Sequence, residues 1–174
     1  MRVRIPMLAL AIAAVGCAGA RAPVPVAGAP GVTIPSVVKN ALDAQWGGWQ
    51  IVTPGAEAAP CASRFDRPPV AVATGDWNGD GTDDLAFQIA APDGRRIVVA
   101  FARLDGAYVL REVSAVQDAG GVLGVKRRAR SYRQQADGIE FFYSLDTLAF
   151  GPCDQPETVY FWNGTAFEGR RVFD

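Results

Sequence analysis

One acidic segment, residues 76–84, holds the side chains with the clearest chemical potential. It reads Asp-Trp-Asn-Gly-Asp-Gly-Thr-Asp-Asp, so side-chain oxygens fall at its first, third, fifth and ninth positions, and the seventh can offer its carbonyl. Calcium takes about six to eight oxygen ligands in a flexible cage. Gly81, at the sixth position, gives the backbone the freedom that a sharp turn needs. The spacing predicts a Ca²⁺ site made by Asp76, Asn78, Asp80, Thr82 and Asp84.

The segment differs from an EF-hand, and a metal-free acidic turn is its main alternative. The twelfth position counted from Asp76 is Phe87, where an EF-hand needs a bidentate Glu, and the flanking residues have strand character. The carboxylates of Asp76, Asp80 and Asp84 would repel one another if they were buried together without a cation. Asp83 is out of register with the ligand positions, so its side chain is expected to point outward.

The acidic segment and its flanks resemble a known repeat. Residues 74–86 look like one FG-GAP or VCBS-type repeat, the unit of integrin-like propellers. The resemblance implies the same calcium ligands, with the aromatic residue at the second position, Trp77, packed beneath the loop. Because the motif occurs once, a full propeller is not expected. The whole chain is also similar to small exported bacterial proteins that have one such motif, an N-terminal helix and a closing hairpin, here residues 160–164.

The N-terminus has the features of an export signal. Arg2 and Arg4 precede residues 5–15, which are uncharged and too few to span a bilayer. Residues 14–17 resemble a bacterial lipobox, which predicts a signal peptide over residues 1–16 and a lipid on Cys17. The alternative is ordinary cleavage after Ala20, which would release a soluble periplasmic or secreted protein.

A low-complexity stretch follows the signal. Residues 17–34 are mostly Ala, Gly, Pro and Val, with Arg21 as the only charge. Such a sequence buries too little side-chain area to offset its ordering entropy, and its prolines favour extended conformations. We expect a tether over residues 17–34 and a single folded domain over residues 35–174. In the lipoprotein interpretation the domain faces the periplasm, and only the lipid contacts the membrane.

Cys61 and Cys153 remain once Cys17 is assigned to the signal region. Two cysteines in an oxidising compartment most simply form one disulfide. Two separate buried thiols are the alternative.

The domain is expected to be α+β and mainly β. A short helix, with Ser36 as its N-cap, places Val38, Leu42 and Trp46 on one face. Residues 54–69, rich in Pro and Ala, are expected to form a loop. Alternating patterns and Asp-Gly or Asn-Gly turns predict antiparallel strands. The helix is expected to pack on one antiparallel meander sheet or on two stacked ones. Candidate strands cover residues 49–52, 70–74, 85–90, 96–104, 107–113, 122–127, 139–144, 158–162 and 167–172.

Composition excludes several function classes. Histidine is absent, which removes imidazole-based catalysis and His-containing metal sites. The 17 basic and 18 acidic residues leave a net charge of −1, which argues against nucleic-acid binding. The basic residues 126–130, with Arg133, are interpreted as a solvated strand end, and a contact with anionic lipid or phosphate is the alternative. The four tryptophans are interpreted as core residues, with a saccharide-stacking face as the alternative: Trp46, Trp49, Trp77 and Trp162.

These features favour a noncatalytic, calcium-binding module of the bacterial cell envelope. Its partner would be an unknown envelope protein or ligand, and the protein is expected to be a monomer. Two other function classes remain open. One is an inhibitor or immunity protein that blocks a toxic enzyme in the periplasm, and the other is a calcium-dependent hydrolase. The glutamates show no spacing typical of an acid/base pair.

Overall fold

The computed structural model describes residues 33–66, 69–116 and 120–173. The expected signal peptide, the Cys17 lipidation site and all but the end of the expected tether lie outside these residues. Within them, no helix is both long enough and apolar enough to span a membrane. The described part is mainly β, with two antiparallel sheets and two short helices, which confirms the predicted predominance of antiparallel β-structure.

Helix α1 (Ser36–Gln45) begins directly after Pro35, whose carbonyl accepts the N–H groups of Val38 and Lys39. The predicted N-cap at Ser36 is wrong: Pro35 occupies the cap position, so no side chain caps the helix. Val38 and Leu42 are fully buried, and Trp46, where the helix ends, is 8% exposed. One core cluster contains these three side chains together with Phe87, Ile89 and other residues of the sheet that follows.

The first sheet has five strands and follows a simple meander over most of its length. β3 is paired on one side with β4, and on its other side with β1 along one half and β2 along the other. β4 pairs with β5, and residues 97–102 of β4 are all buried, as the apolar run predicts for a central strand. The strands are β1 (Gln50–Ile51), β2 (Val72–Gly75), β3 (Asp84–Ala91), β4 (Gly94–Ala102) and β5 (Tyr108–Val116).

The second sheet has six strands in the order β6-β9-β10-β11-β7-β8, all antiparallel. The chain therefore leaves β6 for the far edge of the sheet, forms the β7–β8 hairpin there, and returns to place β9 beside β6. The sequence predicts four of these strands and misses β7 and β9. The strands are β6 (Val122–Lys126), β7 (Arg130–Gln134), β8 (Glu140–Tyr143), β9 (Thr147–Gly151), β10 (Glu157–Trp162) and β11 (Phe167–Phe173).

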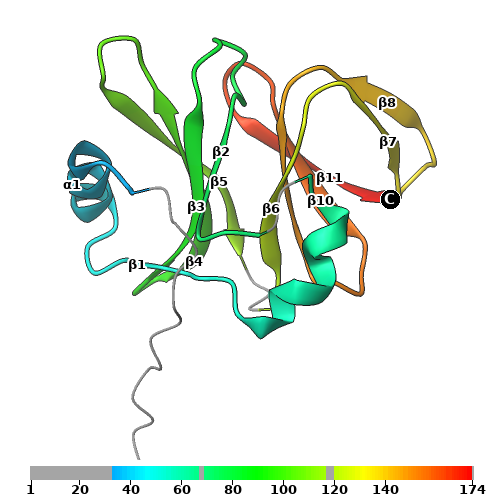
Figure 1. The fold of residues 1–174 in the computed structure, drawn as a ribbon, viewed down its shortest axis with the longest axis horizontal. Helices are drawn as coiled ribbons and strands as arrows, with labels where there is room; N and C mark the ends of the chain where they lie inside the picture. The colour runs from blue at the N-terminus through cyan, green and yellow to red at the C-terminus, as the bar shows by residue number, and fades with distance from the viewer. Residues whose placement is uncertain (1–32, 67–68, 117–119, 174) are drawn as a thin grey trace, which may run out of the picture.

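Two further core clusters cover the faces of the second sheet. One lies between the sheets and joins Trp77, Val99 and Phe101 to Leu148, Phe150 and their neighbours. The other lies on the opposite face, beneath the short helix η1 (Ala56–Arg64), and includes Phe65 and Phe161. Figure 1 shows α1 beside the first sheet and η1 across the second. The expected loop over residues 54–69 is therefore wrong for its middle part, which is helical.

A disulfide joins Cys61 in η1 to Cys153 after β9, with their Cα atoms 5.0 Å apart. This confirms the predicted pairing. The bridge closes a loop with a sequence separation of 92 residues. In the loop-entropy model such a cross-link stabilises the folded state by about 4.5 kcal/mol. It fixes η1 against the second sheet, where Cys61 is completely buried.

Candidate metal site and a buried charge network

The acidic segment forms the loop between β2 and β3. The pairing of Gly75 with Asp84 closes the base of this loop, so its first and ninth positions are brought together. Gly79 and Gly81 have φ angles of 77° and 85°, a region that side chains of L-residues disfavour. The predicted role of Gly81 in the turn is therefore confirmed.

Asp76 organises the loop from its base. The side chain is buried, and its two carboxylate oxygens accept the N–H groups of Gly79 at 2.8 Å and Gly81 at 3.2 Å. These bonds curl the backbone around the carboxylate. Trp77 is fully buried in the cluster between the sheets, beneath the loop, in the place that the resemblance implies.

Asp84 is fully buried, and its carboxylate connects two parts of the fold. One oxygen accepts the N–H of Trp77 at 3.3 Å, and the other accepts the N–H of Ala102 at the end of β4 at 2.9 Å. Burial raises the pKa of Asp84 to about 7, and repulsion from Asp80 and Asp76 adds to the increase, although the two N–H donors oppose it. Within the described residues, none of these three carboxylates forms an ion pair with Lys or Arg.

The outer part of the loop is exposed. Asp80 accepts the N–H of Thr82 at 2.8 Å, and this bond holds the pKa of Asp80 below its usual value. Asn78 accepts the N–H of Asp80 and donates its amide to the other Asp80 oxygen at 2.9 Å. Asp80 is therefore not buried with Asp76 and Asp84 in this structure, because it lies at the exposed tip of the loop.

Asp146 is a neighbour of the loop that the sequence does not reveal. This residue precedes β9 and is 3% exposed. Its carboxylate accepts the N–H of Asp76 at 3.3 Å and the N–H of Arg128 at 2.8 Å. It therefore ties the base of the loop to the second sheet. Because it lies 70 positions from Asp76, no local spacing indicates the contact.

The donor set suits calcium, because every side-chain ligand in the predicted set offers a hard oxygen. Each carboxylate has about four lone-pair positions, and the backbone N–H groups of the loop occupy only some of them. In the described parts of the chain, however, no three acidic or cysteine side chains gather closely enough to hold a metal ion. The residues thus fit the ion in chemistry, with Asp76 and Asp84 buried at the base of the loop and Asp80 exposed at its tip.

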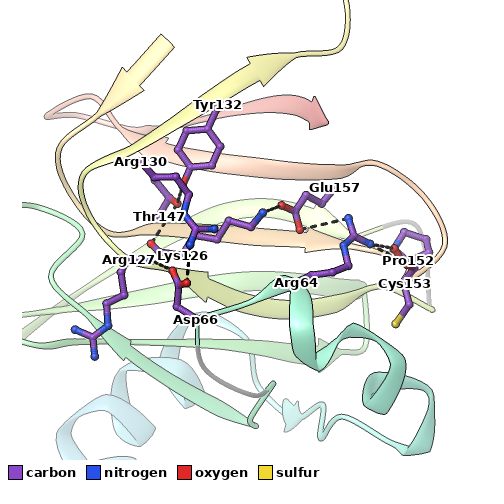
Figure 2. A network of polar contacts seen from close by, with 10 residues as sticks. All are labelled: Arg64, Asp66, Lys126, Arg127, Arg130, Tyr132, Thr147, Pro152, Cys153 and Glu157. Carbon is purple, nitrogen blue, oxygen red and sulfur yellow. Dashed lines mark hydrogen bonds and ion pairs between the residues drawn. The ribbon is translucent and has the colours of Figure 1, made fainter. Parts of the chain in front are cut away.

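A second polar cluster lies between η1 and the second sheet (Figure 2). Lys126 on β6 and Glu157 on β10 form an ion pair, with side chains that are 0% and 1% exposed. Arg64 at the end of η1 reaches the same carboxylate at 3.5 Å. It also donates to the carbonyls of Pro152 and Cys153, at 2.9 and 3.0 Å. The interpretation of Lys126 as part of a solvated basic cluster is therefore wrong.

The other side of this network is built on Tyr132. Its hydroxyl bonds to that of Thr147 at 2.7 Å, and burial raises the pKa of Tyr132 to about 12. Nearby, Asp66 pairs with Arg130 at 2.6 Å and accepts the N–H of Arg127. The network joins the end of η1 to β6, β7, β9 and β10, so it ties together strands that are remote in sequence.

Comparisons with known proteins add no family assignment. No protein-family model matches the chain, and neither a curated protein nor a solved structure is detectably similar to it.

Proposed function

We propose that this protein is an exported, calcium-stabilised binding module of the bacterial cell envelope, related to FG-GAP repeats and anchored through a lipid on Cys17. It acts without catalysis. Bound calcium would supply positive charge to the carboxylates of the β2–β3 loop. The residues that would hold it are Asp76, Asn78, Asp80, Asp84 and the carbonyl of Thr82.

The observation that carries the calcium proposal is the burial of Asp84 beside Asp76. Asp84 is 0% exposed and Asp76 is 5% exposed. Burial raises the pKa of Asp84 to about 7, and the nearby carboxylates of Asp80 and Asp76 add to the increase, so the ionised form of Asp84 lacks a compensating positive charge. A divalent cation relieves that repulsion, and the all-oxygen donor set favours calcium over softer metals.

The Cys61–Cys153 disulfide supports the exported location. Disulfides form and persist in oxidising compartments, such as the bacterial periplasm, and are rare in the cytosol. A domain that works there benefits from a covalent cross-link and from a metal supplied by the medium.

Thermal melting of the purified protein, first in EDTA and then in added calcium, tests the proposal. Calcium that binds only the folded state stabilises it by about 2.7 kcal/mol at a hundredfold excess over Kd. For a domain of this size, that gain raises Tm by about 5–10 °C. Magnesium is expected to raise Tm less, because it demands a stricter octahedral cage.

Two alanine variants in the same loop provide a matched pair. Asp80→Ala removes a predicted ligand and is expected to abolish most of the calcium-dependent increase in Tm. Asp83→Ala removes the same charge from an exposed position outside the ligand register, and most of the increase should remain. If Tm is the same in EDTA and calcium, and elemental analysis finds no bound calcium, the loop is an ordinary acidic turn.

A further inference from the structure

An open pocket of about 540 Å³ lies beside the acidic loop, where the layer between the two sheets reaches the surface. Asn78 and Asp80 of the loop form one wall, and the β4–β5 hairpin forms another. Trp162 at the end of β10 contributes from the second sheet. The volume is within the range of about 300–1,000 Å³ that is typical of small-molecule sites.

The floor of the pocket is aromatic and held in place. Trp162 is half-buried, and its ring packs against Phe101 with centroids 4.7 Å apart and against Phe167 at 5.1 Å. These contacts orient the indole at the open end of the core. A partly exposed aromatic ring of this kind offers a flat apolar surface on which a ligand ring can stack.

The pocket lining includes two arginines, Arg103 and Arg111, and two aspartates, Asp80 and Asp105. The Arg103 side chain is 60% exposed and lies 3.8 Å from Asp105. Arg111 on β5 is exposed, and its guanidinium donates to the carbonyl of its neighbour Leu110 at 3.0 Å. Among the described residues, Arg111 forms no ion pair with a carboxylate. Its planar fork is therefore available for a carboxylate of a ligand.

We propose that this pocket binds an acidic saccharide, with the sugar ring stacked on Trp162 and the sugar carboxylate paired with Arg111. Three features of the pocket support an acidic saccharide as the ligand. The indole favours a ligand with a ring that can stack on it, and Arg111 favours a ligand with a carboxylate. Asp80 and Asn78 on one wall and Arg103 on the β4–β5 hairpin together present acceptors and donors, which suits hydroxyl groups because a hydroxyl both donates and accepts. A ligand with several negative charges would be repelled by Asp105, and also by Asp80 when the loop holds no calcium.

This inference rests on the proposed binding role and names the class of ligand. Most of the pocket is formed by side chains that are not proposed calcium ligands, and only Asn78 and Asp80 belong to both sites. Calcium in the loop would neutralise Asp80 and so strengthen the attraction of the pocket for an anion. Saccharide affinity is therefore expected to be higher in calcium than in EDTA.

Titration calorimetry of the full chain tests the proposal. The probes are galacturonate and glucuronate oligosaccharides, with galactose and glucose oligosaccharides of the same length as neutral counterparts and triglutamate as an acidic peptide. Binding of at least one acidic saccharide, at least about tenfold tighter than its neutral counterpart, is expected, because a charge-assisted hydrogen bond contributes about 1.5–3 kcal/mol.

Substitutions of Arg111 and Trp162 test the ion pair and the ring stacking separately. Arg111→Gln is expected to weaken acidic-saccharide binding about tenfold or more, whereas Arg127→Gln, an identical change at an exposed arginine that does not line the pocket, should leave it unchanged. Trp162→Ala should abolish binding and Trp162→Phe should retain part of it. Equal binding of the neutral counterparts or of triglutamate, wild-type affinity in Arg111→Gln, or no saccharide binding by the folded wild-type protein would each overturn the proposal.

The calcium proposal is tested separately, by thermal melting of the same protein preparation in EDTA and in calcium. If Tm does not respond to calcium but an acidic saccharide binds through Arg111, the pocket proposal stands and the calcium proposal fails. If calcium raises Tm and no acidic saccharide binds, the pocket proposal fails and the calcium proposal stands.

Discussion

Replacing Glu157 by Gln removes the negative charge that faces Lys126 and Arg64 beneath η1. Lys126 is completely buried and cannot regain hydration in the folded state, whereas the Arg64 side chain is 19% exposed. Removing one member of a buried ion pair leaves a buried charge uncompensated and costs about 3–5 kcal/mol. Because whole domains are stable by only about 5–15 kcal/mol, Glu157→Gln is expected to remove a large share of the stability.

The reciprocal change should cost less. In Lys126→Met, the Glu157 carboxylate keeps Arg64 at 3.5 Å, so a loss of about 1–3 kcal/mol is expected. In the double variant Lys126→Met/Glu157→Gln, the fully buried charges are both removed and Arg64, which is partly exposed, keeps its bonds to the carbonyls of Pro152 and Cys153, so most of the Glu157→Gln loss should be recovered. The two substitutions are therefore expected to be strongly non-additive.

Urea unfolding followed by tryptophan fluorescence, with the disulfide intact, measures these differences. The slope of the free energy of unfolding against urea should be the same for all variants, so that midpoints report stability alone. Two results would refute the reasoning: a loss below about 1 kcal/mol in Glu157→Gln, or a double variant whose loss equals the sum of the two single losses.

Three shorter predictions concern the same face of the second sheet. Cys61→Ser opens the disulfide and is expected to lower the free energy of unfolding by about 2–5 kcal/mol in urea titrations. The pKa of Tyr132 is raised from 10.0 to about 12, so folding favours the protonated phenol. The stabilisation of the folded state by this phenol is therefore complete below pH 10 and is lost as the pH rises to 12. Ultraviolet titration should show a phenol that ionises near pH 12 and is absent in Tyr132→Phe, and an unchanged titration curve in Tyr132→Phe at that pH would contradict the burial. Gly124→Ala places a Cβ 2.1 Å from the Phe65 ring and should cost about 1–3 kcal/mol by thermal melting, whereas Gly47→Ala, with 3.7 Å to its nearest atom, should cost much less.

The parts of the fold that the sequence predicts are those with local causes. The apolar run in β4 and the turn glycine Gly81 depend on burial and backbone freedom at their own positions. The pairing of Cys61 with Cys153 is nearly forced once the compartment is assigned. None of these features requires knowledge of which strands become neighbours.

The missed features depend on long-range pairing. β7 reads Arg-Ser-Tyr-Arg-Gln, and only Tyr132 is buried in it, so its composition resembles a solvated loop. The burial of Lys126 becomes favourable only when β10 brings Glu157 across the sheet and η1 brings Arg64. Asp146 reaches the base of the acidic loop from the second sheet. A pattern along one segment cannot indicate partners that the topology supplies.

The position of the disulfide also decides how the domain responds to mechanical force. A pull on the two ends of the chain passes directly from Cys61 to Cys153, and the 92 positions between them are shielded from extension, about 300 Å of extended chain. β2 through β9, with the acidic loop, lie within the shielded part, whereas β10 and β11 lie outside it. Tension on the C-terminal end would therefore load β11 and then β10, and loss of β10 would withdraw Trp162 from the pocket while the acidic loop remained folded. A bound ligand would be released by load before the domain was lost.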